Sequence, residues 1–186
     1  MVHGHLAGCK QPCGAKSTCL EMERNDDRFS PKMNPQTLIA PTLRLAGQGR
    51  VIRAFGDEVI MHLEGADTGG ALSLWTNITL PGGGPPPHYH DNENEWFVLQ
   101  EGRVSFLVDG KWQEVKAGGV VFAPRGSVHT FKNVGDQPSR MIISTSPSGF
   151  ETFFSRCADE FAKPGGPNME RIIEISAEHG IHYVQP

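Results

Sequence analysis

Short segments in which apolar and polar residues alternate, separated by turn residues, constrain the fold of this chain more than any other feature. In the longest segment, 71–80, Leu72 and Leu74 begin one face, while Ser73 and Trp75 begin the other. A period of two is typical of a β-strand, because successive side chains of a strand point to opposite faces. The segments with this character are 51–55, 58–63, 71–80, 95–100, 103–109, 120–123, 128–133 and 140–146.

Turn residues between these segments indicate antiparallel pairing. Gly102 and Gly135 follow strand-like segments, and Asp109-Gly110 is a strong signal for a hairpin turn. The chain has 22 glycines and 14 prolines, which suits a fold with many turns. About eight short strands at regular spacing therefore predict an all-β fold, either an antiparallel sandwich or a barrel.

Chain length and changes of pattern predict one domain with two flanking segments. The 186 residues suffice for one hydrophobic core and are too few for two large domains. Residues 1–45 show little periodicity, so we expect irregular structure there. Residues 46–147 carry the strand-like segments and are expected to form a β-barrel domain. Residues 148–186 are expected to form a C-terminal helical extension.

The C-terminal extension follows the period of a helix instead of a strand. Asn168 is a suitable N-cap for a helix over 168–179, and Gly180 is a suitable stop. The residues 181–184 alternate again, so they either add an edge strand or close a lid. An earlier amphipathic helix, expected to pack outside the β-domain, is indicated by the spacing of Phe150, Phe153, Phe154, Cys157 and Phe161.

Charge and hydropathy exclude two classes of partner. The formal net charge is -4 and the isoelectric point is about 6.0, with no basic patch, so nucleic acid is not expected as a partner. The mean hydropathy is -0.34, and no apolar run approaches the roughly 20 residues that span a bilayer. We therefore expect a protein that does not insert into membranes and that binds a small molecule.

The four cysteines of the chain give an indication of its cellular compartment. Cys9, Cys13 and Cys19 lie near the N-terminus, far from Cys157, and their spacing matches no strong zinc or disulfide framework. A zinc knuckle formed by the N-terminal cysteines with neighbouring histidines is an alternative. Free thiols in a reducing environment are the simpler interpretation and predict a cytoplasmic protein.

Two histidines one residue apart mark the candidate site. His88 and His90 follow prolines 85–87, and in a strand both histidines face the same side, with Tyr89 opposed. The polar residues 91–94 are turn-prone and let the chain double back. Glu95 then begins an antiparallel neighbour and is expected to face the same interior as the two histidines.

A second segment completes the site. After the tight turn at 124–126, His129 enters the next strand-like segment, with Phe131 on the same face. Imidazole suits zinc, copper, iron and nickel, and a carboxylate adds affinity for manganese and iron. Three imidazoles and one carboxylate leave about two octahedral positions open, which is typical of a reactive metal site. The alternative is an ordinary polar loop that happens to contain histidines.

The double pattern resembles the signature of the cupin superfamily. Its fixed positions are Gly82, His88, His90, Glu95 and Gly102, followed by Gly118, Pro124, Gly126, His129 and Asn133. The resemblance extends over about 51–145 and implies a small antiparallel β-barrel of the jelly-roll type. It also implies that the metal ligands are His88, His90, Glu95 and His129.

Within this superfamily, the sequences PSGFETFF and HGIHYV near the C-terminus are similar to those of single-domain, quercetin dioxygenase-like members. The implied cofactor is a divalent transition metal, with iron, manganese or nickel preferred and zinc, cobalt or copper also compatible. Strand phase places Phe97, Leu99 and Phe131 on the same face as the ligands, so these residues are expected to line the pocket.

Other polar residues near the site receive lesser roles. Glu93 is expected to be a solvated turn residue, although an additional base or ligand is an alternative. Arg125 is a weak candidate for contact with an anionic substrate. Asn133 is expected to fix the turn at the end of its strand. Surface or packing roles are expected for His62, His179 and His182.

The expected function is that of a metal-dependent dioxygenase acting on a small aromatic or otherwise apolar molecule. Glu95 is the candidate catalytic residue, either as a ligand or as a base toward a substrate hydroxyl. The alternatives are an isomerase, lyase or decarboxylase that uses no O2, or a binding module without catalysis. Exposed strand edges and the 75–79 face predict a homodimer.

Overall fold

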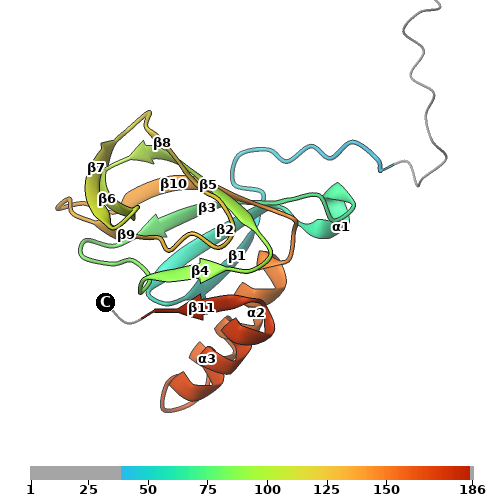
Figure 1. The fold of residues 1–186 in the computed structure, drawn as a ribbon. Coiled ribbons are helices and arrows are strands. Elements are labelled where there is room, and N and C mark those ends of the chain that lie inside the picture. Colours follow the sequence, from blue (N-terminus) through green and yellow to red (C-terminus); the bar gives the residue numbers. More distant parts are fainter. Residues whose placement is uncertain (1–38, 185–186) are drawn as a thin grey trace, which may run out of the picture. The chain divides into compact units, whose positions relative to one another are not determined.

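Antiparallel strands dominate the part of the chain that the computed structural model describes, residues 39–184 (Figure 1). The expectations for the N-terminal cysteines lie outside these residues. In chain order, the strands and helices are β1 (Arg50–Ala54), β2 (Asp57–Leu63), α1 (Gly65–Thr68), β3 (Ser73–Thr79), β4 (His88–His90), β5 (Asn94–Glu101), β6 (Arg103–Val108), β7 (Lys111–Lys116), β8 (Val120–Ala123), β9 (Thr130–Asn133), β10 (Ser139–Ser146), α2 (Phe150–Phe161), α3 (Met169–Glu178) and β11 (Ile181–Tyr183).

The strands form three sheets. A six-stranded sheet has the order β1-β2-β3-β10-β5-β8, a three-stranded sheet has the order β7-β6-β9, and β11 pairs with β4. An isolated bridge between His88 and His129 connects β4 to the residue just before β9. Within residues 39–184 the pairing therefore gives separate sheets and not one continuously closed barrel. The mostly-β fold predicted from the alternating segments is present.

Strand alternation builds the core from one face of the large sheet. In β10, Met141 and Ile143 are buried between less buried neighbours, and in β3 the buried side chains include Trp75 and Asn77. The 75–79 face packs inside the molecule, because Trp75, Asn77 and Thr79 are at most 3% exposed and the Trp75 ring stacks on Phe150 of α2. The use of this face for dimerisation was wrong, and the homodimer itself stays a prediction.

One strand and one short helix were missed. β7 is mostly exposed and contains lysine and glutamate residues, so it lacks an alternating apolar pattern. Its existence follows from the hairpin signal, because Asp109 and Gly110 have positive φ values of 50° and 72° at the turn that joins β6 to β7. The α1 helix is a single four-residue turn, too short to give a periodic pattern.

The C-terminal extension returns to the β-domain. The Asn168 side chain accepts a hydrogen bond from the Arg171 N–H and caps α3 as expected. Gly180 has a φ of 71°, and a Cβ there would lie 2.6 Å from the Asn92 amide nitrogen. The chain then forms β11 along β4, so the residues after α3 add a strand (Figure 1).

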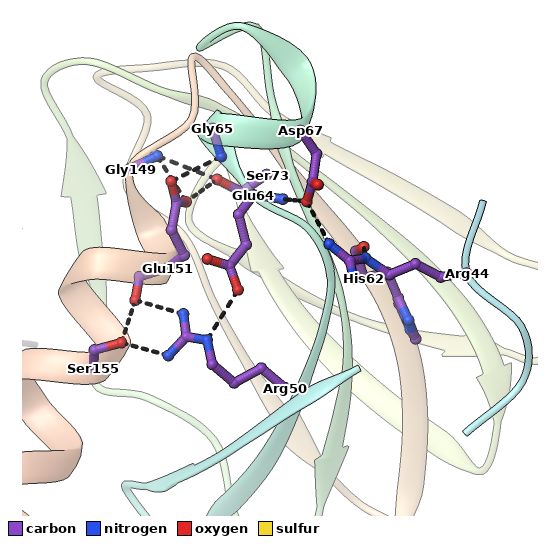
Figure 2. Close-up of polar contacts among 10 residues, drawn as sticks. All are labelled: Arg44, Arg50, His62, Glu64, Gly65, Asp67, Ser73, Gly149, Glu151 and Ser155. Atoms are coloured by element: carbon purple, nitrogen blue, oxygen red, sulfur yellow. Dashed lines mark hydrogen bonds and ion pairs between the residues drawn. The ribbon is translucent and has the colours of Figure 1, made fainter. Parts of the chain in front are cut away.

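A carboxylate ties the start of α2 to two other elements (Figure 2). Glu151 accepts hydrogen bonds from the backbone N–H of Gly65 at 2.9 Å and of Gly149 at 3.1 Å. It also accepts one from the Ser73 hydroxyl at 2.5 Å. Because a negative charge is favourable in the first turn of a helix, Glu151 suits this position and fixes α2 against α1 and β3.

Candidate metal centre

Four side chains from three neighbouring segments converge inside the protein. His88 and His90 come from β4, Glu95 from β5, and His129 from the residue before β9. Each offers a nitrogen or oxygen atom, and these four atoms all lie within 4.8 Å of one another. All four residues are buried. The structure thus brings together the four residues that the sequence pattern singles out as metal ligands.

Backbone carbonyls orient two of the histidines. The Nδ1 atom of His88 lies 2.8 Å from the Pro86 carbonyl oxygen, and that of His129 lies 2.9 Å from the Ser127 carbonyl oxygen. A carbonyl oxygen can only accept, so each Nδ1 carries a proton and donates it. This arrangement directs both Nε2 atoms into the cluster and is typical of metal-binding histidines.

The buried polar atoms of the cluster are poorly satisfied by protein partners. Among residues 39–184, neither ring nitrogen of His90 has a hydrogen-bond partner. Its Nε2 atom lies 3.8 Å from a Glu95 carboxylate oxygen, which lies 3.0 Å from the Nε2 atom of His129. Buried polar groups without partners are costly. A divalent metal would satisfy them, so the residues fit such an ion.

Burial also favours the neutral imidazole that a metal requires. It lowers the pKa of His88 to about 4, and the nearby His129 adds to this effect. It lowers the pKa of His90 to about 2, with further contributions from the two other histidines. Burial acts in the same direction on His129, but its hydrogen bond to Glu95 and the charge of Glu95 outweigh it, so the pKa is raised.

The cluster opens into a largely apolar pocket. The space between atoms in and around it, open solvent included, is about 690 Å³. Phe97 and Phe131 line it, whereas Leu99 is only 1% exposed and lies in the core without lining the pocket. The other apolar lining residues are Phe55, Trp75, Ile143, Phe150, Phe153, Phe154 and Ile181.

Sequence reasoning missed the pocket residues of the C-terminal extension. The aromatic side chains of α2 were expected only to pack on the outside, but Phe150, Phe153 and Phe154 line the pocket. Ile181 and Tyr183 of β11 line it as well. The aromatic face of α2 was visible in the sequence, but the docking of that face onto the pocket depends on long-range contacts.

The acidic turn differs from expectation at Glu93. This residue is 7% exposed, and its Oε2 atom has no hydrogen-bond partner in the part of the chain that the structure describes. The turn lies close to the start of α2, since a Cβ on Gly149 would be 4.0 Å from the Glu93 carboxylate. Burial raises the pKa of Glu93 to about 7. The prediction of a solvated side chain was wrong.

The remaining candidates lie outside the cluster. The exposed Arg125 does not line the pocket, and its backbone N–H donates to Asn94.

The Asn133 side chain donates to the Thr79 carbonyl and accepts from the Gly135 N–H, as expected of a residue that fixes a turn. The three other histidines of residues 39–184 each contact a polar neighbour: His62 contacts Thr76, His179 contacts Arg156, and His182 contacts Asp91.

Antiparallel sheets around three histidines and one glutamate define a β-protein with a candidate metal site, and comparison with known proteins agrees. Residues 78–145, which include all four clustered side chains, match the family model described as "Cupin domain". The match supports a cupin domain in this segment of the chain.

Curated relatives match only in part. The chain is 33% identical over 82 residues to "Polyketide synthase CurC" of Streptomyces cyaneus, covering 43% of this chain and 53% of that protein. It is 32% identical over 104 residues to "Probable oxidoreductase patJ" of Penicillium expansum, covering 50% of this chain and 32% of that protein. The chain thus spans about half or less of the length of these relatives.

A solved structure is similar in fold. The polyketide cyclase RemF from Streptomyces resistomycificus matches with a TM-score of 0.51 and 22% identity, covering 59% of this chain and 81% of that one. In the described residues, no helix is both long and apolar enough to cross a membrane.

Proposed function

We propose that this protein is a metal-dependent oxidoreductase of the dioxygenase type, acting on a small aromatic molecule. The observation that carries the proposal is the position of the cluster: three imidazoles and a carboxylate face an aromatic-lined pocket. The similarity to a probable oxidoreductase supports the reaction class. We further propose that the sheets are parts of a jelly-roll barrel, as in quercetin dioxygenase-like cupins.

The residues divide into those that would hold the ion and those that would receive the substrate. His88, His90 and His129 would supply Nε2 atoms, two of them oriented by backbone carbonyls. A bound iron, manganese or nickel ion would supply Lewis-acid or redox activation of a substrate beside it. Glu95 would complete the ligand set or accept a proton from a substrate hydroxyl.

The pocket supports an aromatic substrate. The Trp75 and Phe150 rings are stacked with centroids 5.4 Å apart, and Phe154 packs against Trp75 edge-on at 5.6 Å. Rings held in this way offer flat apolar surface to a flat ligand. Two of the similar proteins are named as a polyketide synthase and a polyketide cyclase, which supports a polycyclic aromatic polyketide as the substrate class.

Oxygen consumption tests this function. The protein would be stripped with a chelator, reloaded separately with iron(II), manganese(II) or nickel(II), and mixed with hydroxylated aromatic compounds. We expect O2 uptake that depends on both metal and substrate and that is lost in Glu95→Ala. Uptake by none of the metal forms across flavonols, catechols and polycyclic phenols would overturn the dioxygenase assignment.

An O2-independent reaction is the second candidate, favoured by the similarity to a polyketide cyclase. In that case the site would polarise a carbonyl and Glu95 would move a proton during ring closure or isomerisation. Substrate turnover under strict exclusion of O2, with a product of the same elemental composition as the substrate, would identify this second function.

A further inference from the structure

The pocket has a second polar group besides the metal cluster. Asp57, the first residue of β2, and Asn77 of β3 line the same pocket as His88 and Glu95. The Asn77 amide nitrogen donates to the Asp57 Oδ2 atom at 2.8 Å and to the Thr79 hydroxyl at 2.8 Å. The other oxygen atoms of the pair, Asp57 Oδ1 and Asn77 Oδ1, are both hydrogen-bond acceptors.

This pair lies on strands that do not carry the cluster. In the large sheet, β3 and β10 separate β2 from β5, which carries Glu95. Asp57 on β2 is therefore three strand positions from β5, roughly 14 Å across the sheet, and Asn77 on β3 is two positions from it. The apolar Trp75 and Ile143 line the same pocket. The pocket thus has acceptors on β2 and β3, and metal-binding groups on β4 and β5.

An acidic residue at this place is costly to the fold. Burial raises the pKa of Asp57 against the lowering effect of its hydrogen bonds to Asn77 and Thr79, so its charged form is incompletely solvated. The next inward positions of β2 are the buried, apolar Val59 and Met61. A half-buried carboxylate that lines a largely apolar pocket is a candidate ligand-binding group.

The turn that leads into Asp57 is held by α2. Phe55 and Gly56 have φ values of 58° and 81°, as a two-residue hairpin turn between β1 and β2 requires. The Phe55 ring packs on Phe153 with a centroid distance of 6.1 Å and on Phe161 at 5.0 Å. Contacts with α2 thus fix the turn from which Asp57 begins β2.

We propose that Asp57, held in place by Asn77, is a specificity-determining residue that accepts a hydrogen bond from a ligand hydroxyl remote from the metal cluster. The ligand would be an elongated, fused-ring phenol whose opposite end faces His88, His90, Glu95 and His129. The proposal rests on the proposed function for the aromatic class of the ligand. A neutral hydroxyl suits the site better than an ammonium group, because the apolar walls would desolvate a cation.

A pair of coloured probes tests this proposal. The compounds are 2,6-dihydroxyanthraquinone, with a hydroxyl at each end of three fused rings, and 2-hydroxyanthraquinone, with only one. Dissociation constants are measured by absorbance titration in mildly acidic buffer that keeps the hydroxyls protonated. The proteins are wild type, Asp57→Asn, Asp57→Leu and the control Glu58→Gln, which alters the neighbouring carboxylate that pairs with Arg53.

We expect wild type and the Glu58 control to bind the diol about tenfold more tightly than the mono-ol, as one hydrogen bond to a charged group predicts. Asp57→Leu should reduce this preference to about twofold, because the diol can still enter the pocket with either of its two equivalent ends. The affinity of this variant for the mono-ol should stay nearly unchanged. The retained mono-ol affinity shows that the leucine variant is folded. Asp57→Asn, which keeps the shape and an acceptor oxygen, should retain an intermediate preference.

Other outcomes separate this proposal from the proposed function. An equal preference in wild type and Asp57→Leu overturns the role of Asp57 while leaving the aromatic pocket supported. Failure of wild type to bind either probe overturns both the role of Asp57 and the polycyclic substrate class. The metal site is decided independently, by the metal content of wild-type protein.

Discussion

The metal cluster and the C-terminal extension line the same pocket but depend on the sequence in different ways. The clustered side chains come from β4, β5 and the residue before β9, all inside the region that matches the cupin family model. The extension, with α2, α3 and β11, lies wholly outside that region, yet it supplies five pocket residues. The four clustered side chains therefore lie inside the segment that matches the family model, whereas these five pocket residues lie outside it.

The physical reason for the difference is the range of the contacts. His88 and His90 share a face because they are two residues apart in a strand, and Glu95 follows after one short turn. Phe150 reaches the pocket only because it stacks on Trp75, which is 75 positions earlier in the chain. Local spacing along the chain thus determines the cluster, whereas contacts between distant segments determine the pocket residues of the C-terminal extension.

The largest expected effect is on the cluster. His88→Ala should abolish stoichiometric metal binding, because it removes one of the four proposed ligands. Loss of a residue that only hydrogen-bonds to a ligand already costs about 10–100-fold in affinity. Metal content after dialysis, measured by mass spectrometry, checks this prediction. His62→Ala, which removes a histidine that bonds to Thr76 outside the cluster, is the control and should keep its metal. Equal metal content in the His88 and His62 variants contradicts the assignment of His88 as a ligand.

A smaller but still large effect is expected at β11. Ile181 is 4% exposed, lines the pocket and lies opposite His90 in the β11–β4 register. Ile181→Ala should lower the free energy of unfolding by about 2–5 kcal/mol, through lost burial and the cavity left behind. Urea denaturation measures this change. In the control Ile173→Ala, the replaced side chain is 55% exposed, so the change should be much smaller.

The same variant also sharpens the comparison between the two regions. Ile181→Ala should weaken binding of aromatic ligands while leaving metal content near that of wild type, since it removes part of the wall and no metal ligand. Loss of metal together with loss of ligand affinity would mean that β11 is needed to position His88 and His90, and that the two regions are not separable.

Sequence reasoning predicted the elements that have a strong local period. The alternating segments became strands, and the aromatic spacing after 149 became α2. The same reasoning placed Leu99 in the pocket because it shares the phase of Phe97, but two residues along β5 the strand has passed from the pocket into the core. Strand phase predicts which face of the sheet a side chain points to. It does not predict whether that part of the strand borders the pocket.

Burial of Glu93 had no local signal either. The turn at 91–94 is polar, and polar turns are usually solvated. The side chain is buried because the turn lies close to Gly149, at the junction of β10 and α2, more than fifty residues away. A tertiary contact of this kind cannot be predicted from the composition of the turn.

The attachment of α2 to the sheet gives a third prediction. Burial raises the pKa of Glu151, but hydrogen bonds from Ser73 and from three backbone N–H groups outweigh it, so the pKa is lowered on folding. Glu151→Gln should lower the free energy of unfolding by about 1–3 kcal/mol at neutral pH, since an amide cannot accept all of these bonds. Urea denaturation at neutral pH checks the value.

The pH dependence of this variant has a definite sign. A carboxylate whose pKa is lowered on folding stabilises the native state above its unfolded pKa of about 4.3, and this contribution is lost as the pH falls. The difference between wild type and Glu151→Gln should therefore be constant above about pH 5 and shrink toward pH 3. A difference that grows on acidification would show that another group controls the attachment of α2.

The smallest effect is expected at Arg50, in the same contact region (Figure 2). Its guanidinium group donates to Glu64 at 2.9 Å and to the Ser155 hydroxyl at 2.7 Å, so it also connects the sheet to α2. The residue is exposed, and exposed ion pairs contribute at most about 1 kcal/mol. Arg50→Ala should thus change the free energy of unfolding less than Glu151→Gln, and the change should shrink in high salt because solvent ions screen the pair.

The two variants together determine how the extension is held. If Arg50→Ala destabilises the protein as much as Glu151→Gln, and does so at high salt as well, the attachment of α2 depends on its solvent-exposed polar contacts. If the expected order holds, the attachment depends on the half-buried Glu151 carboxylate and on the stacking of Phe150 on Trp75. The α2 side of the pocket would then be held mainly by contacts that salt screens less than it screens the exposed Arg50 pair.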